Sequence, residues 1–138
     1  MMKCRQATLD KVKKLTLDIL GFPYKVQFVE ELMARFQVCG CANIWGGEIQ
    51  LDPDVTTLDM FASLFHEILE VMCRKTETKC DHELIGRMET FFMMILINNP
   101  ELIEMALHAA KTKEGKSLKN RRTKKAKGLV KGGQGKGK

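Results

Sequence analysis

Apolar and polar residues alternate along the first half of the chain with the period of strands. Four stretches read as strands, namely residues 15–20, 24–29, 42–45 and 48–52. Gly21-Phe22-Pro23 separates the first two, because proline is not expected inside a central strand, and Gly46-Gly47 supplies a tight turn between the last two. A short helix is expected over residues 7–15, while residues 30–36 fit either a helical turn or an irregular connection. The strands predict a small antiparallel sheet.

Three helical patterns occupy the second half of the chain. Thr56 or Thr57 caps the first helix, and Asp81 caps the second. Asn98-Asn99-Pro100 ends the second helix, because residues before proline avoid the helical region, and residues 101–110 form the third. The apolar arcs expected to face the core are Leu84, Ile85, Met88, Phe91, Phe92, Ile95 and Leu96 in the second helix, and Leu102, Ile103, Ala106 and Leu107 in the third. We expect an α+β fold in which the sheet packs on two antiparallel helices, with a third helix after them.

Charge divides the chain into two parts. Residues 111–138 hold 12 of the 23 Lys and Arg and a single acid, for a net +11, whereas residues 1–110 hold 11 basic and 16 acidic residues, for −5. The basic part has no apolar period and six of the eleven glycines, so we expect residues 1–110 to be one domain and residues 111–138 a disordered tail. Such a tail attracts the phosphates of DNA or RNA without sequence preference; the alternative is a purely solubilising role.

The apolar runs, the first residues and the cysteines indicate the cellular compartment. Charges interrupt every apolar run well before the eighteen or so residues of a membrane span, and the first residues are too polar for a signal peptide, so no membrane contact is expected. The five cysteines are an odd number without a disulfide-framework spacing. We therefore expect free thiols, a reducing compartment and a cytoplasmic protein, and regard a cysteine-rich zinc site as the weaker alternative because the chain lacks CxxC knuckles.

Two histidines and three carboxylates gather in the first two helices of this half. On a helix of about 3.6 residues per turn, His66 and Glu70 lie one above the other, with Glu67 at the edge of their face. His82 and Glu89 share a stripe on the next helix. Imidazole and carboxylate ligands suit zinc, so His66, Glu70, His82 and Glu89 are candidate ligands of a Zn²⁺ ion. Glu67, next to the first ligand, is the candidate catalytic general base for a water molecule.

The same residues also have a simpler interpretation. His66, Glu67, Glu70 and Arg74 lie opposite the apolar arc of their helix, and such an arrangement needs no metal. Glu70 and Arg74 then form an ordinary i,i+4 ion pair on a solvated face.

The motifs resemble those of a known family. His66-Glu67-Ile68-Leu69-Glu70, the segment from His82 to Met88-Glu89, and Asn98-Asn99-Pro100 resemble, at their spacing, the signature of small bacteriophage and prophage proteins related to zincin metallopeptidases. The resemblance covers roughly residues 17–107. It implies a zincin-like fold and host-cell cytoplasm as the location, and the ligand roles of Glu70 and His82 depend on it in part.

Two classes of function follow from these features. The first is a zinc-dependent metallohydrolase of peptidase type, acting on a peptide or protein; the strand ending at Leu51-Asp52 would then align the substrate as an added strand. The second is a non-catalytic phage accessory protein that binds nucleic acid through residues 111–138 and whose metal site is structural or vestigial.

Overall fold

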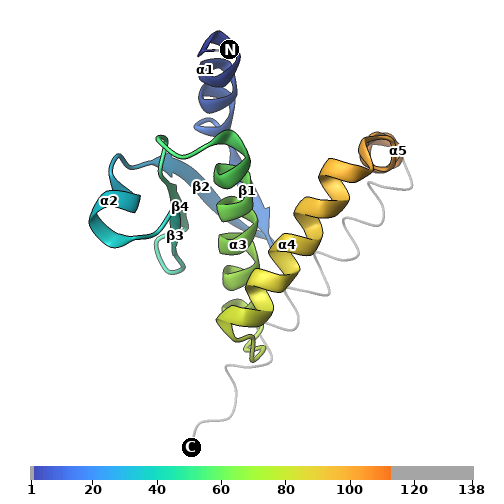
Figure 1. Cartoon of the computed structure of the whole chain (residues 1–138). Helices are drawn as coiled ribbons and strands as arrows, with labels where there is room; N and C mark the ends of the chain where they lie inside the picture. Colours follow the sequence, from blue (N-terminus) through green and yellow to red (C-terminus); the bar gives the residue numbers. More distant parts are fainter. Residues whose placement is uncertain (1, 113–138) are drawn as a thin grey trace, which may run out of the picture.

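The described part of the chain, residues 2–112 of the computed structural model, contains five helices and four strands (Figure 1). In chain order these elements are α1 (Met2–Val12), β1 (Thr16–Ile19), β2 (Phe22–Phe28), α2 (Leu32–Phe36), β3 (Gly40–Asn43), β4 (Glu48–Leu51), α3 (Thr57–Lys75), α4 (His82–Asn98) and α5 (Pro100–Lys111). The α+β class is confirmed, and the ambiguous residues 30–36 contain the short helix α2. The expected disordered tail lies, from residue 113 on, outside the described residues.

The sheet is mixed, so the expectation of a purely antiparallel sheet is wrong. Its strand order is β1-β2-β4-β3, with β1 and β2 antiparallel, β3 and β4 antiparallel, and β2 and β4 parallel. The reason is that the connection after β2, which contains α2, leads past the place directly beside β2 and enters β3 first. As a result β3 forms the edge and β4 returns between β3 and β2, with Val26 opposite Ile49 and Phe28 opposite Leu51.

Pro23 lies within β2, a central strand, which the sequence argument excluded. It is paired with Asp18 of β1, whereas the pairing of β2 with β4 begins only at Lys25. The proline therefore occupies a section of β2 that has no partner on the β4 side, where a missing N–H breaks no ladder bond.

The core lies between the sheet and α3. Period-2 alternation in β4 buries Ile49 and Leu51 completely, and Met60 and Val71 of α3 pack in the same cluster. Burial of each such side chain contributes about 1.5–3 kcal/mol, so this interface fixes α3 against the sheet. Thr56 begins α3 as predicted, because its hydroxyl accepts a hydrogen bond from the amide of Asp59 at 3.2 Å.

Helix α4 folds back along α3 in the antiparallel sense. Asp81 caps it as predicted, its carboxylate accepting a hydrogen bond from the amide of Leu84 at 2.7 Å. The rings of Phe65 and Phe92 stack with centroids 5.9 Å apart. The expectation that the apolar arcs of α4 and α5 are core is largely wrong: Ile85 is the one buried residue of α4, and α5 has none. The reason is that α4 extends away from the sheet and α5 follows at its far end (Figure 1), so both helices project beyond the core.

The connection between α3 and α4 contains a disulfide bond between Cys73 and Cys80, so the prediction of free thiols is wrong for this pair. Cys39 and Cys41 are free.

Within residues 2–112, every helix taken singly is too short or too polar to cross a membrane. The pair α4 and α5 reaches the required length and apolar composition only jointly, across a bend of 96°.

Candidate metal centre

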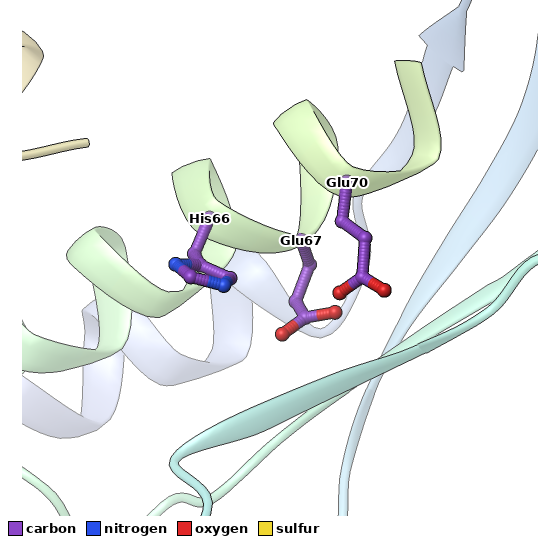
Figure 2. Close-up of side chains that lie close together, drawn as sticks. All are labelled: His66, Glu67 and Glu70. Atoms are coloured by element: carbon purple, nitrogen blue, oxygen red, sulfur yellow. The ribbon is translucent and has the colours of Figure 1, made fainter. Parts of the chain in front are cut away.

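Helix α3 presents three of the predicted site residues toward the sheet. Possible ligand atoms of His66, Glu67 and Glu70 all lie within 4.8 Å of one another, and their side chains point to the same region in Figure 2. The local cause is helical spacing, which stacks positions 66 and 70, while the packing of α3 on the sheet turns position 67 inward. A histidine and two carboxylates at this separation form a donor set that fits a divalent transition metal.

Helix α4 brings the other two predicted residues to the same place. Glu89 contacts Nδ1 of His66 through Oε2 at 2.9 Å. The ring of His82 meets the ring of His66 edge to face, with centroids 4.8 Å apart. All five residues line one cavity of about 630 Å³, together with Ser63, Arg74 and residues 38–42, which lead into β3 and form most of it.

The contact with Glu89 determines how His66 can act. An ionised carboxylate only accepts hydrogen bonds, so Nδ1 carries the proton and donates it to Glu89. In the neutral form of the ring, Nε2 then keeps a lone pair that can bind a metal. Metal-binding histidines are commonly oriented by a carboxylate on the other nitrogen in this way. The geometry thus gives Glu89, predicted as a ligand, a direct role in orienting His66.

Glu67 is buried, with 6% of its surface exposed, and is not at the edge of an open face as expected. Burial raises the pKa of its carboxyl group to about 7, and the negative charges of Glu70 and Glu89 raise it as well. The charge of His66 and a backbone hydrogen bond from Ala42 of β3 oppose this rise in pKa. A carboxyl group in this environment exchanges its proton near neutral pH, as a general base or acid requires.

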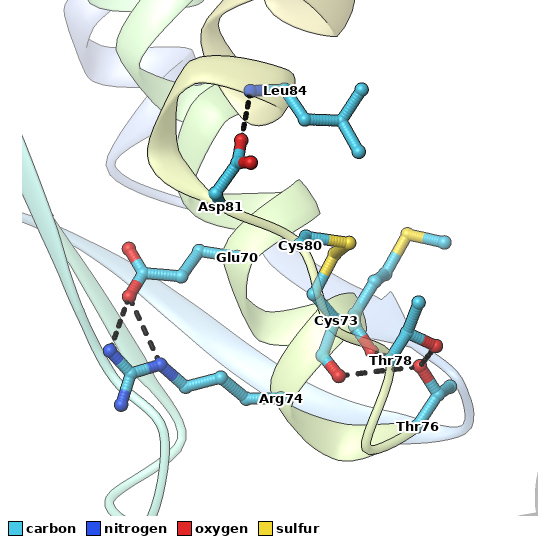
Figure 3. Close-up of a disulfide and its surroundings, with 9 residues drawn as sticks. Glu70, Cys73, Arg74, Thr76, Thr78, Cys80, Asp81 and Leu84 are labelled. Atoms are coloured by element: carbon cyan, nitrogen blue, oxygen red, sulfur yellow. Dashed lines mark hydrogen bonds and ion pairs between the residues drawn. A yellow bond between two sulfur atoms is a disulfide. The ribbon is translucent and has the colours of Figure 1, made fainter.

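Glu70 is held by Arg74, as in the simpler interpretation of this helix. The guanidinium donates to Oε1 of Glu70 from Nη2 at 2.7 Å and from Nε at 3.1 Å (Figure 3). Both hydrogen bonds end on the same oxygen, so Arg74 does not engage Oε2. The ion pair therefore reduces the negative charge that Glu70 offers and orients its carboxylate.

The wall of the cavity opposite α3 is β3. The predicted substrate-aligning strand, now β4, is interior to the sheet, because β2 and β3 flank it. The edge strand beside the site is β3, and sequence reasoning missed it because the strand order depends on long-range pairing.

Two cysteines, Cys41 of β3 and Cys39 just before it, also line the cavity. Burial, and secondarily the charge of Glu67, raise the pKa of the Cys41 thiol. The Cys39-Gly-Cys41 pattern was visible in the sequence, but its closeness to Glu67 follows from the sheet topology.

Scans against known protein families, curated proteins and solved structures find no match to this chain.

Proposed function

We propose that this protein is a zinc-dependent hydrolase of peptidase type, related to the phage zincin-like proteins that its motifs resemble. The observation that carries this proposal is the set of donor atoms of His66, Glu67 and Glu70 within 4.8 Å, combined with the 2.9 Å contact that orients His66. A solvated helix face explains the pair of Glu70 and Arg74, but it does not explain why a carboxylate is buried beside them.

In this proposal His66 binds zinc through Nε2 and Glu70 through a carboxylate oxygen. His82, which lines the same cavity, supplies a third ligand from α4. Three protein ligands of this kind leave a coordination position open. When bound, zinc polarises the substrate carbonyl and makes water more acidic.

Residues of the protein transfer the proton, orient the zinc ligand and bind the substrate. Glu67 accepts the proton of the attacking water at its carboxylate and returns it to the leaving amine. Glu89 keeps the ring of His66 in one tautomer and orientation. The edge strand β3 runs beside these groups, and its outer backbone offers hydrogen bonds to an extended peptide that adds as a further strand.

The first experiment measures the zinc content of the purified protein by elemental mass spectrometry. We expect about one zinc per chain, lost in His66→Ala and retained in His108→Ala, a control on α5 away from the cavity. Wild-type protein that remains folded and takes up no added zinc would disprove the metal site.

The second experiment assigns the role of Glu67. Glu67→Gln should retain zinc and lose hydrolysis of a peptide library, because the amide keeps the shape of the side chain but cannot accept the proton. Loss of zinc in this variant would make Glu67 a ligand and would overturn its assignment as the base.

The alternative function, a nucleic-acid-binding accessory protein, is favoured by the net +11 charge of residues 111–138. It predicts binding to both DNA and RNA that weakens steeply with salt. Deletion of residues 113–138 should abolish that binding while leaving zinc content and peptide hydrolysis unchanged.

A further inference from the structure

Two sulfur-bearing side chains meet where the chain passes from α2 to β3, and a third follows on β3. The thiol of Cys39 donates to the thioether of Met33, with the two sulfur atoms 3.9 Å apart. Cys41 comes two residues after Cys39, and both cysteines are free thiols. The proposed zinc site uses none of these three residues, so the Cys39-Gly-Cys41 motif is left without a role.

Asp52, directly after β4, fixes the backbone at both residues that meet. Its Oδ2 accepts a hydrogen bond from the amide of Met33 at 2.8 Å, and its own amide donates to the carbonyl of Cys39 at 2.9 Å. The carboxylate is buried, with 1% of the residue exposed, and its Oδ1 accepts from the amide of Asp54 at 2.8 Å. One buried residue therefore sets the separation of Met33 and Cys39, as a preorganised pair of ligands requires.

The two thiols lie on the side of β3 that faces away from α3. Cys41 is opposite Gln50 of β4, and its thiol contacts Oε1 of Gln50 at 3.5 Å. Gly40, between the two cysteines, faces α3, since a Cβ atom there would lie 3.4 Å from Cβ of Ser63. Because side chains alternate along a strand, Cys39 and Cys41 share the opposite side. In Figure 1, β3 and β4 run between α2 and α3, so the thiols lie on the α2 side and the candidate metal centre on the α3 side.

The separation and the chemistry of these sulfur atoms fit a soft metal ion. Metal–sulfur bonds are about 2.3 Å long, so two sulfur ligands of one ion at an angle of about 110–120° lie about 3.8–4.0 Å apart. The 3.9 Å between Cys39 and Met33 has this value. Thiolate combined with thioether favours Cu(I), whereas zinc takes thiolate, imidazole and carboxylate. Met33 is 50% exposed, so an ion can reach the pair from solvent.

We propose that Met33, Cys39 and Cys41 bind one Cu(I) ion. Met33 and Cys39 supply the two ligands that already lie at the required separation. Cys41 supplies the third ligand after its thiol leaves Gln50. Each cysteine binds as the thiolate, so two protons pass to solvent when the ion is taken up and no electron is transferred. This site uses no residue of the proposed zinc site and does not depend on it.

The test is an anaerobic titration of the full chain with Cu(I), kept reduced by ascorbate, in competition with a chromogenic Cu(I) chelator. We expect about one Cu(I) per chain. Met33→Leu conserves the side-chain volume and removes the thioether. It should weaken binding by about tenfold or more, because loss of a residue that only orients a metal ligand already costs about 10- to 100-fold. Cys39→Ser should weaken binding further, and Met105→Leu, at an exposed methionine of α5, is the matched control that should bind like the wild type.

Three results would overturn the proposal. The first is wild type that takes no Cu(I) from the chelator, and the second is Met33→Leu that binds as tightly as the wild type. The third is binding that is lost in Cys4→Ser or in Cys73→Ser/Cys80→Ser, which would place the ion on another thiol. Weaker binding in Met33→Leu and Cys39→Ser, with circular dichroism like that of the wild type, supports the site.

The two metal sites can fail separately. Cys39→Ser should keep the zinc content of the wild type, because the zinc ligands lie on the other side of β3. His66→Ala should keep Cu(I) binding for the same reason. Loss of Cu(I) binding in His66→Ala would show that copper occupies the zinc site instead and would also overturn the proposal.

Discussion

Glu67→Gln should stabilise the metal-free protein at alkaline pH. Burial raises the pKa of Glu67 from an ordinary value of 4.5 to about 7. Because the folded-state pKa of this acid lies above the unfolded-state value, the folded protein binds the proton more tightly than the unfolded chain. Stability is therefore lost as the pH rises from about 4.5 to about 7, and the loss is complete above that range. Glutamine, which stays neutral, avoids this loss.

The magnitude follows from the difference between the two pKa values. At about 1.4 kcal/mol per pKa unit, the ionised carboxylate destabilises the fold by roughly 3 kcal/mol at pH 8, and by only roughly 1 kcal/mol at pH 5. This is a substantial part of the 5–15 kcal/mol that stabilises a typical domain, so urea unfolding of chelator-treated protein at the two pH values can resolve it.

The expected result is a stability gain in Glu67→Gln that is larger by roughly 2 kcal/mol at pH 8 than at pH 5. Glu104→Gln, at an exposed position on α5, reports the effect of removing one surface carboxylate. A gain that does not change with pH would refute the claim that the burial of Glu67 controls its ionisation.

Three further predictions concern single contacts elsewhere in the fold and beside the site. The Cys73–Cys80 disulfide closes a loop with a sequence separation of 7, and its reduction should lower the free energy of unfolding by about 2 kcal/mol. Denaturation with and without dithiothreitol measures this loss. A Cys73→Ser/Cys80→Ser variant should show no change with dithiothreitol. Arg74→Gln should tighten zinc binding about threefold in a competition titration with a chelator, because it removes a cation from Glu70; weaker binding would show instead that Arg74 is needed to position that ligand. Tyr24→Phe should cost about 1 kcal/mol in urea unfolding, because it removes the 2.9 Å hydrogen bond from a buried hydroxyl to a backbone carbonyl, and an unchanged stability would contradict that role.

Features that depend on nearby residues were predictable from the sequence. The caps Thr56 and Asp81 act within three residues along the chain, and both were predicted with their helices. The meeting of His66 with Glu89 was also predictable, because it needs only two antiparallel helices with a short connection. Helical periodicity and cap chemistry thus suffice to predict that α3 and α4 bring His66 and Glu89 together.

Features that depend on long-range pairing were not predictable in the same way. Alternation shows that residues 48–51 form a strand but not that this strand inserts between β2 and β3, because the period is the same at an edge and in the centre. Consequently β3, with Cys41 and the backbone of Ala42, was not recognised as the wall of the site. The apolar arc of α4 was assigned to a core for a related reason: periodicity shows that one face of a helix is apolar, but not whether the rest of the fold covers that face.

Helix α4 supplies the part of the candidate site that α3 does not. Its inner side carries Glu89 and the single buried residue Ile85, whereas Leu84, Met88 and Phe91 are exposed. Helix α4 is held against α3 by the buried side chain of Ile85, the Phe65–Phe92 stack and the contacts of His66 with Glu89 and His82, and the Cys73–Cys80 disulfide lies just before its start. The orientation of His66, the candidate zinc ligand, therefore depends on how firmly these contacts hold α4 against α3.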